Sequence, residues 1–233
     1  PISVRPIRWI VPFPAGGPTD LVSRAVGARL SVVLGQQVVI DNRAGAGGSI
    51  GVVATLQAEP DGYTFGLGVL GPLAILPNFA RAPFRTADVH YVSQLVRSPH
   101  VLAVNRGGHA RDLKAWIEAA RAAPGRTSWG SPGVGSSSYF AGELFASEAK
   151  LDLVHVAYKG GAPLTVALVA GEIPLASLEI SALLPLQARL AGVATLSEKR
   201  AAQLPDVPTA IELGLENVVS HSVYGVIEPE KVP

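Results

Sequence analysis

The chain has 233 residues, a formal net charge of +1 and no cysteine or methionine. This length can bury the core of one domain or of two modest lobes, and we expect two. A nucleic-acid partner is not expected, because it would require a strongly basic face. Disulfides and thiolate metal sites are excluded, and the five histidines are dispersed without metal-ligand spacing, so we expect no metal.

The stretch VPFPAGGPTD, residues 11–20, joins an apolar strand to an amphipathic helix that we expect to end at Gly35. Its two glycines let the backbone approach a ligand closely. The first amides of the helix have no partner inside the helix, so they can donate hydrogen bonds to an anion. This loop is therefore a candidate anion-binding site.

Strands and helices alternate along the rest of the first hundred residues. We expect strands at 37–40 and 63–67, each preceded by a helix, and a turn at 71–73. This alternation predicts a parallel sheet covered on both faces. Two further strands, at 91–96 and 101–104, lie where the pattern changes and mark the crossover into a second lobe.

The second half repeats the pattern of the first. A helix is expected from Leu113 to Pro124 with Asp112 as its cap. Further expected strands lie at 128–129, 153–156, 173–178, 190–194 and 220–227, the last returning to the first lobe. The loop GSPGVGSSS, residues 130–138, again joins a strand to a helix, and open α/β sheets bind ligands at this end of their strands.

Neither glycine-rich loop carries lysine or arginine. An anion there would be bound by backbone amides, hydroxyls and bridging waters. The alternative is that glycine and proline only form turns at these positions. An α/β hydrolase acting through the serines at 136–138 is a further alternative, but no G-x-S-x-G motif surrounds them, and we assign no catalytic residue.

Two other patterns are weak. The glycines at 45–51 resemble a dinucleotide-binding fingerprint, but Ile50 occupies its last glycine position, and Asp41, Asn42 and Arg43 lie between the strand and the glycines, so no cofactor is expected. The uncharged run 62–80 is interrupted by glycine and proline, so we do not expect the chain to span a membrane.

Six blocks of sequence follow one another in a family order: VPFPAGGPTD, DNRAGAGGSIG, EPDGYTFGLG, GSPGVGSSSYFAGELF, HVAYKGGAP and LPDVPTAIELGL. Together they resemble the Bug family, the TctC-like extracytoplasmic solute-binding proteins of tripartite tricarboxylate transporters. The resemblance implies an α/β, periplasmic binding protein-like (type II) fold, with two lobes joined by crossover strands and a ligand cleft between them. Lobe 1 would comprise 1–98, lobe 2 99–221, and the return strand 222–233, with lobe 1 truncated at its carboxyl end.

The resemblance also implies a function. The protein would be a periplasmic monomer, its signal peptide removed, that captures a dicarboxylate, tricarboxylate, acidic amino acid or aromatic acid for a membrane permease. An alternative is a ligand-dependent partner of a membrane sensor kinase. Glu179 would lie where relatives that bind amino acids meet the ligand's amino group. Leu70 replaces a small hydroxyl residue, which implies a more apolar pocket suited to an aliphatic or aromatic acid.

The implied ligand-binding residues lie in the two glycine-rich loops, in the turn after the third strand and after two strands of the second lobe. They are Phe13, Pro14, Ala15, Gly16, Gly17, Thr19, Asp20, Leu70, Gly71, Ser131, Gly133, Gly135, Ser136, Ser137, Ser138, Tyr158 and Glu179.

Overall fold

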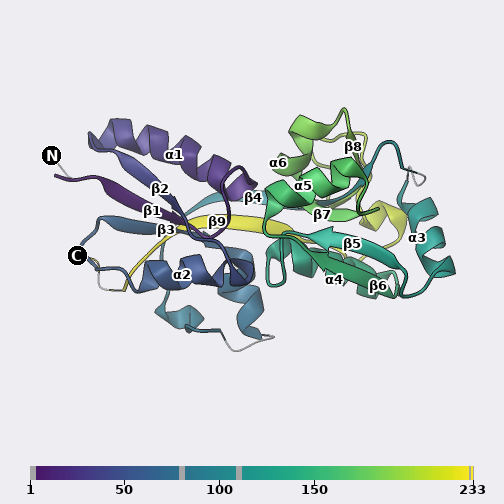
Figure 1. Ribbon diagram of the computed structural model, residues 1–233, viewed down its shortest axis with the longest axis horizontal. Helices are drawn as coiled ribbons and strands as arrows, with labels where there is room; N and C mark the ends of the chain where they lie inside the picture. Colours follow the sequence, from purple (N-terminus) through teal and green to yellow (C-terminus); the bar gives the residue numbers. More distant parts are fainter. Residues whose placement is uncertain (1–3, 79–81, 109–111, 231, 233) are drawn as a thin grey trace. The chain divides into compact units, whose positions relative to one another are not determined.

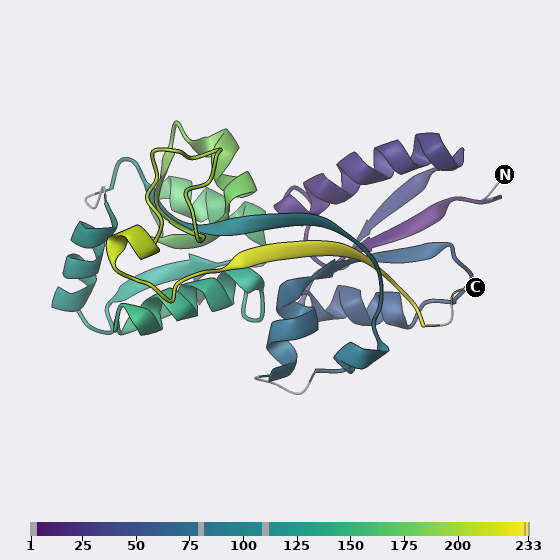
Figure 2. The same ribbon diagram turned by 180° about the vertical axis from the view of Figure 1, so that it is seen from behind.

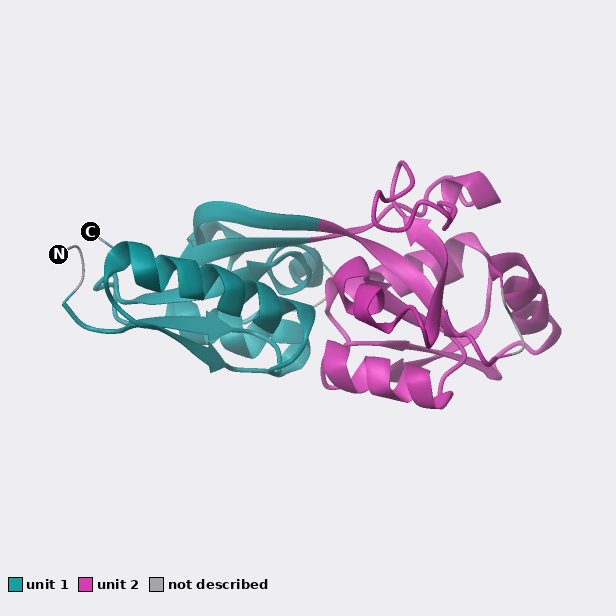
Figure 3. Ribbon diagram, turned by 90° about the horizontal axis from the view of Figure 1, so that it is seen from above, with its two compact units in different colours: residues 1–97, 223–233 teal, residues 98–222 magenta. Residues whose placement is uncertain are grey.

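The computed structural model describes residues 4–78, 82–108, 112–230 and 232. The chain forms two compact α/β units (Figure 3). Unit 1 comprises Pro1–Arg97 and Val223–Pro233, and unit 2 comprises Ser98–Ser222. The chain therefore passes twice from one unit to the other.

In unit 1 the strands of the sheet follow the order β2-β1-β3-β9, and the first part of β4 lies next to β9. The first three strands are parallel and β9 is antiparallel to β3. The helices α1 and α2 cover opposite faces of this sheet (Figure 1). In chain order the main elements are β1 (Ile7–Val11), α1 (Pro18–Leu34), β2 (Val38–Asn42), α2 (Ser49–Leu56), β3 (Thr64–Val69), a π-helical segment (Gly71–Ile75), the first part of β4 (His90–Asn105) and β9 (His221–Glu228).

Alternation along the strands explains the two faces. Trp9 and Val11 of β1 pack with Leu67 and Val69 of β3 beneath α1. On the other face, α2 packs closely because Gly66 has no side chain, and any Cβ at that position would collide with Thr55. At the end of α1, Gly35 adopts a left-handed conformation with φ 66°, which confirms the predicted helix stop.

In unit 2 the same sheet continues in the order β4-β7-β5-β6, and β8 also pairs with β4. Strands β5, β6 and β7 are parallel, whereas β4 is antiparallel to both β7 and β8. In chain order the elements after β4 are α3 (Leu113–Ala122), β5 (Thr127–Ser131), α4 (Ser137–Glu148), β6 (Leu153–Ala157), α5 (Gly161–Ala170), β7 (Ala176–Glu179), α6 (Ile180–Leu183) and β8 (Leu190–Leu196). The predicted Asp112 cap is confirmed, because its carboxylate accepts from the Ala115 amide at 2.8 Å.

The two strands predicted at 91–96 and 101–104 are one continuous strand, β4, of 16 residues. The gap between the two predicted strands contains Pro99, and proline cannot donate to a sheet ladder. The fixed φ of proline is nevertheless compatible with an extended chain, so the strand continues through it. Figure 2 shows β4 in teal beside β9 in yellow, its neighbour in the sheet.

The described helices include none that is long and apolar enough to cross a membrane. The uncharged run that begins at residue 62 instead contributes β3 and the π-helical segment after it.

Helix α4 lies directly over the indole of Trp129, and this contact organises one core of unit 2. Trp129 is 2% exposed, and a Cβ added at Gly142 would overlap its ring. Phe145, one turn further along α4, packs in the same core with Trp116 of α3. A glycine is required at residue 142 for the helix to approach the sheet this closely.

We expect Gly142→Ala to destabilise the protein by about 1–3 kcal/mol, because the new methyl group overpacks the Trp129 ring. Urea denaturation measures this change. The control is Ser147→Ala, an exposed substitution in the same helix that should stay within about 0.5 kcal/mol of the wild type. Equal effects of the two substitutions would contradict the close packing of α4 on Trp129.

Candidate functional site

The first loop, residues 12–17, connects β1 to α1 at the carboxyl edge of the unit 1 sheet. Helix α1 begins after Gly17, and Pro18 in its first position has no N–H. The Leu21 amide donates to the Gly17 carbonyl at 3.0 Å and is the first amide with a partner inside the helix. The amides of Thr19 and Asp20 precede it and are therefore the donors that this helix start offers.

The side chain of Asp20 holds the first loop in shape. One carboxylate oxygen accepts from the Gly16 amide at 3.0 Å and from Arg24 Nε at 2.8 Å. The other accepts from Asn42 Nδ2 at 3.1 Å, and the same nitrogen donates to the Phe13 carbonyl at 3.0 Å. Asp20 is only 2% exposed, and its carboxylate is used in hydrogen bonds that hold the loop. Its backbone amide is one of the first-turn donors of α1.

Ionisation of Asp20 follows from this environment. Burial alone raises the pKa of its carboxyl group, but the hydrogen bonds from Arg24, Gly16 and Asn42 outweigh burial and hold the pKa below the ordinary value of 3.8. The positive charge of Arg24 is committed to this pair, so Arg24 is not an additional cation for a ligand.

The loops after β1, β2 and β3 meet at this edge of the unit 1 sheet. A Cβ at Gly48, which follows β2, would lie 3.2 Å from both the Phe13 ring and Pro72. The predicted residues Leu70 and Gly71 open the π-helical segment beside Pro72. Of the other predicted residues, Ala15 and Gly16 are exposed, Pro14 is half-buried and Gly17 is buried.

The second loop, residues 132–136, connects β5 to α4 in unit 2. Gly133 and Gly135 have φ values of 130° and 89°, which a residue with a side chain rarely adopts. Ser136 caps α4, since its hydroxyl accepts from the Tyr139 amide at 3.1 Å and donates to the Gly133 carbonyl at 2.7 Å. The amides of Ser137 and Ser138 are therefore the first-turn donors of α4.

Ser131 ends β5 and ties the second loop to β6. Its hydroxyl lies 2.8 Å from His155 Nε2 and accepts from the Gly133 amide at 3.2 Å. Its carbonyl accepts from the Tyr158 amide at 3.0 Å. Burial lowers the pKa of His155, which favours the neutral ring that this contact uses.

Tyr158 contributes its backbone amide to the loop, whereas its ring packs elsewhere. A Cβ at Gly130 would lie 3.2 Å from the Tyr158 ring and closer still to Leu164 and Ile173, which belong to the core beneath α5. Burial, with a smaller contribution from the charge of Glu172, raises the pKa of the Tyr158 hydroxyl.

Ser137 and Glu179, two of the predicted residues, are joined through a serine that the sequence reasoning missed. Ser222 Oγ lies 2.8 Å from Ser137 Oγ and donates to Glu179 Oε1 at 2.9 Å. It also lies 3.3 Å from His100 Nε2, and His100 Nδ1 lies 3.0 Å from Ser220 Oγ. No local motif could have indicated this set, because β4, β7, β9 and α4 each contribute to it.

His100 is fully buried within this set. The pKa of His100 is lowered to about 3, mainly by burial; a hydrogen bond to the Ser220 backbone opposes this shift, and the neighbouring His221 adds to it. The imidazole is therefore neutral at physiological pH, with one nitrogen that donates and one that accepts.

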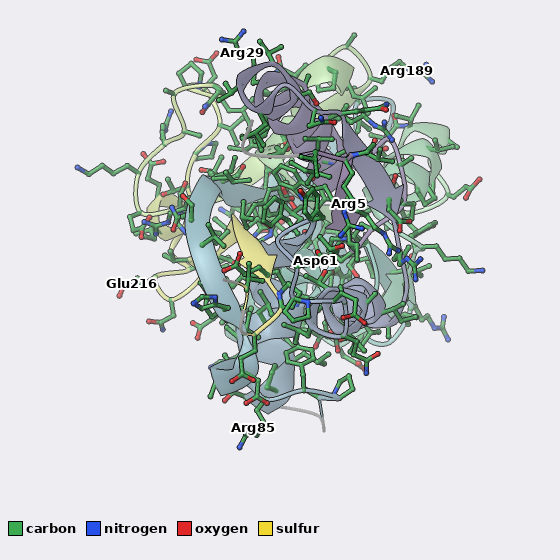
Figure 4. The ribbon with its side chains drawn as sticks, turned by 90° about the vertical axis from the view of Figure 1, so that its left-hand side faces the viewer. Arg5, Arg29, Asp61, Arg85, Arg189 and Glu216 are labelled. Carbon is green, nitrogen blue, oxygen red and sulfur yellow. The ribbon has the colours of Figure 1, made fainter. Side chains whose placement is uncertain are left out.

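Lysine and arginine are absent from both loops. Arg43, close to the first loop in sequence, pairs with Asp41 at 3.0 Å. Figure 4 shows Arg5 beside Asp61, with which it forms an ion pair, and Arg29 and Arg85 toward the periphery of the view. Among the described residues, no group of three or more histidine, aspartate or glutamate side chains could hold a metal ion. The donors offered by the two loops are thus uncharged.

The sequence from residue 22 to 233 matches the tripartite tricarboxylate transporter family receptor. The chain belongs to this family. It is 36% identical, over 97% of its length, to the protein BugT of Bordetella pertussis, of which it covers 71%. It is also 36% identical, over 98% of its length, to a Pseudomonas sp. strain P51 protein of the tcbD-tcbE intergenic region, of which it covers 69%.

Solved structures agree with this assignment. MatC of Rhodopseudomonas palustris with bound malate is 29% identical with a TM-score of 0.93, over 99% of this chain and 80% of that one. An R. palustris protein with adipate is 31% identical with a TM-score of 0.93, over 99% and 78%. The periplasmic binding protein BugD is 27% identical with a TM-score of 0.94, over 99% and 78%. The predicted Bug-type family and periplasmic binding protein fold are confirmed, and the family consists of solute-binding receptors rather than enzymes.

The Asp20 contacts predict a pH dependence of stability. Because the folded-state pKa is lowered, the stabilisation by Asp20 is fully present above pH 3.8 and is lost as the pH falls through the lower folded-state value. We expect Asp20→Asn to cost about 1.5–3 kcal/mol at pH 7, and this difference from the wild type should shrink in acid.

Denaturation by urea at a series of pH values measures the difference. Asp206→Asn is the control, because Asp206 is exposed. A difference between wild type and Asp20→Asn that does not change between neutral and acidic pH would show that the charge of Asp20 is not what holds the first loop.

Proposed function

We propose that the protein binds a small organic acid, and that both glycine-rich loops contribute donors to it. The observation that carries the proposal is that each loop ends at a helix start with two first-turn amides, those of Thr19 and Asp20 and those of Ser137 and Ser138. The malate and adipate of two structural neighbours support a carboxylate as the ligand.

The energetics allow this without a cation. One helix start contributes about 0.3–1 kcal/mol toward an anion, or up to ~2 kcal/mol when partly buried. Hydrogen bonds to a charged group contribute roughly 1.5–3 kcal/mol each. Two helix starts and several such hydrogen bonds can reach the roughly 8 kcal/mol of a micromolar complex after ordering costs.

The surroundings of the first loop favour an acid with an apolar body. Phe13 and Leu70 are half-buried at the edge of unit 1 where the loops meet, and neither can pair with a second polar group of a ligand. An aliphatic diacid such as adipate therefore suits these side chains better than a tricarboxylate. Glu179 would receive an amino or hydroxyl group if the ligand carries one.

The family assignment also suggests where the protein acts and which partner receives its ligand. We propose that the protein acts in the periplasm as a monomer and delivers its ligand to the membrane permease of a tripartite tricarboxylate transporter. The family assignment supports a role as a transport receptor, and the neighbour BugD is a periplasmic binding protein.

Adipate and malate are the probes for the ligand class. At about a hundredfold excess over Kd, a binding acid should raise the Tm by roughly 5–10 °C. Adipamide has the same chain without charge and should have no effect if charge is recognised. A panel of small acids that leaves the Tm unchanged would contradict the proposed function.

Gly17→Val tests the first loop in the same assay. Gly17 has φ −86° and ψ 173°, a conformation that valine also adopts, so the backbone can remain unchanged. The added side chain would stand beside the first-turn amides, and we expect it to abolish the rise in Tm with adipate. Ser147→Ala, at the far end of α4, should retain the rise. Undiminished binding by Gly17→Val would remove the first loop from the site.

A further inference from the structure

The polar side chains around Ser222 follow one pattern of donors and acceptors. Ser222, Ser137 and His100 are buried, and Glu179 is half-buried. A serine hydroxyl has one proton to donate and can accept two hydrogen bonds. Ser222 Oγ lies within hydrogen-bonding distance of Ser137, His100 and Glu179. Ser222 donates to Glu179 Oε1 at 2.9 Å, and this contact uses its one proton.

The other two contacts must then be donated to Ser222. The Ser137 hydroxyl donates across 2.8 Å, and the neutral His100 ring donates from Nε2 across 3.3 Å. His100 Nδ1 is left as an acceptor, and Ser220 Oγ lies 3.0 Å from it as the donor. This assignment gives each contact one donor and one acceptor, and all of these residues belong to unit 2.

We propose that Ser222 is a positioning residue of the second loop. Ser222 accepts the hydroxyl proton of Ser137 and passes its own proton to Glu179, so the Ser137 proton points away from the ligand. Ser136 donates its own proton to Gly133. The Ser137 and Ser138 amides and the Ser138 hydroxyl are therefore the donors that α4 presents to an anion. Ser137 Oγ keeps lone pairs, so it can accept a hydrogen bond from a ligand.

Burial explains why the direction is fixed. His100 is 0%, Ser222 1% and Ser137 3% exposed, so bulk water cannot replace a lost partner in this set. Turning the Ser222 proton toward Ser137 would leave two donors facing one another, and turning the Ser137 proton away would leave two acceptors facing one another. An unsatisfied buried polar group carries the full cost of its desolvation.

The tautomer of His100 tests the direction without any ligand. We expect ¹⁵N NMR of histidine-labelled protein to show the neutral Nε2–H form of His100 throughout the range of about pH 5–8 in which an ordinary histidine titrates. In Ser222→Ala, Nε2–H loses its acceptor, and the ring should shift toward the Nδ1–H form, which can donate to Ser220.

Ser177→Ala is the matched control, since Ser177 is a fully buried serine of β7 whose hydroxyl has no partner among the described residues. It should leave the His100 signals unchanged. An Nδ1–H form in the wild type, or an unchanged tautomer in Ser222→Ala, would overturn the proposal.

Should Ser222→Ala not fold, Ser137→Ala replaces it. Removing one of two donors to Ser222 should strengthen the His100 bond and move the Nε2–H proton downfield, and an unmoved proton would overturn the proposal.

A double-mutant cycle tests the positioning role, which rests on the proposed binding of an acid. Adipate is titrated calorimetrically into the wild type, Ser137→Ala, Ser222→Ala and the double variant. If the two hydroxyls act as one unit, the Kd of the double variant for adipate should lie within about twofold of the Kd of the single variant that binds more weakly.

The outcomes are distinguishable. Independent hydroxyls would multiply the two losses, and this result would contradict the positioning role while leaving acid binding intact. A wild type that binds neither adipate nor malate would contradict the proposed function, and the tautomer of His100 would still decide the direction of the hydrogen bonds.

Discussion

The arrangement of both units depends on main-chain N–H groups that a helix cannot satisfy by itself. A parallel strand that runs into a helix through a short loop brings the helix start to the carboxyl edge of the sheet. This occurs after β1 and again after β5, and in both places glycine shapes the loop. The side chains around each helix start are then committed to holding the loop, which leaves the amides as the groups to be satisfied from outside.

The absence of lysine and arginine from the two loops has a physical consequence for selectivity. Hydrogen bonds from amides and hydroxyls are directional, whereas a flexible cationic side chain follows an anion over a range of positions. The proposed recognition through fixed amides would therefore depend on where the carboxylate oxygens lie relative to the body of the ligand. Asp20 in unit 1 and Ser136 in unit 2 supply the necessary rigidity, each through hydrogen bonds to its own loop.

Much of this fold could be predicted from local patterns. The αL stop at Gly35 and the Asp112 cap depend on residues close in sequence, and the structure confirms both. The His100–Ser222 contact could not be predicted, because it joins residues 122 positions apart and depends on the register of β4 against its neighbours. The continuity of β4 between the two predicted strands was missed for a similar reason, since it depends on pairing with distant strands.

The positions of the two glycine-rich loops could be predicted from the sequence, but the use of each of their atoms could not. The sequence indicated which loops contain hydroxyls and amides, yet a motif does not specify whether a hydroxyl faces a ligand or a neighbouring serine. Asp20, Ser136 and Ser137 illustrate this limit, because their side chains are engaged within their own units. Their backbone groups, rather than their side chains, are what the motif supplies.

Titration of the ¹⁵N-labelled protein with adipate, followed through the backbone amide signals, tests the central claim most directly. The account predicts that the amide protons of Thr19, Asp20, Ser137 and Ser138 move downfield together and saturate at one concentration. Signals that move only at lysine or arginine side chains, while these four amides stay in place, would contradict it.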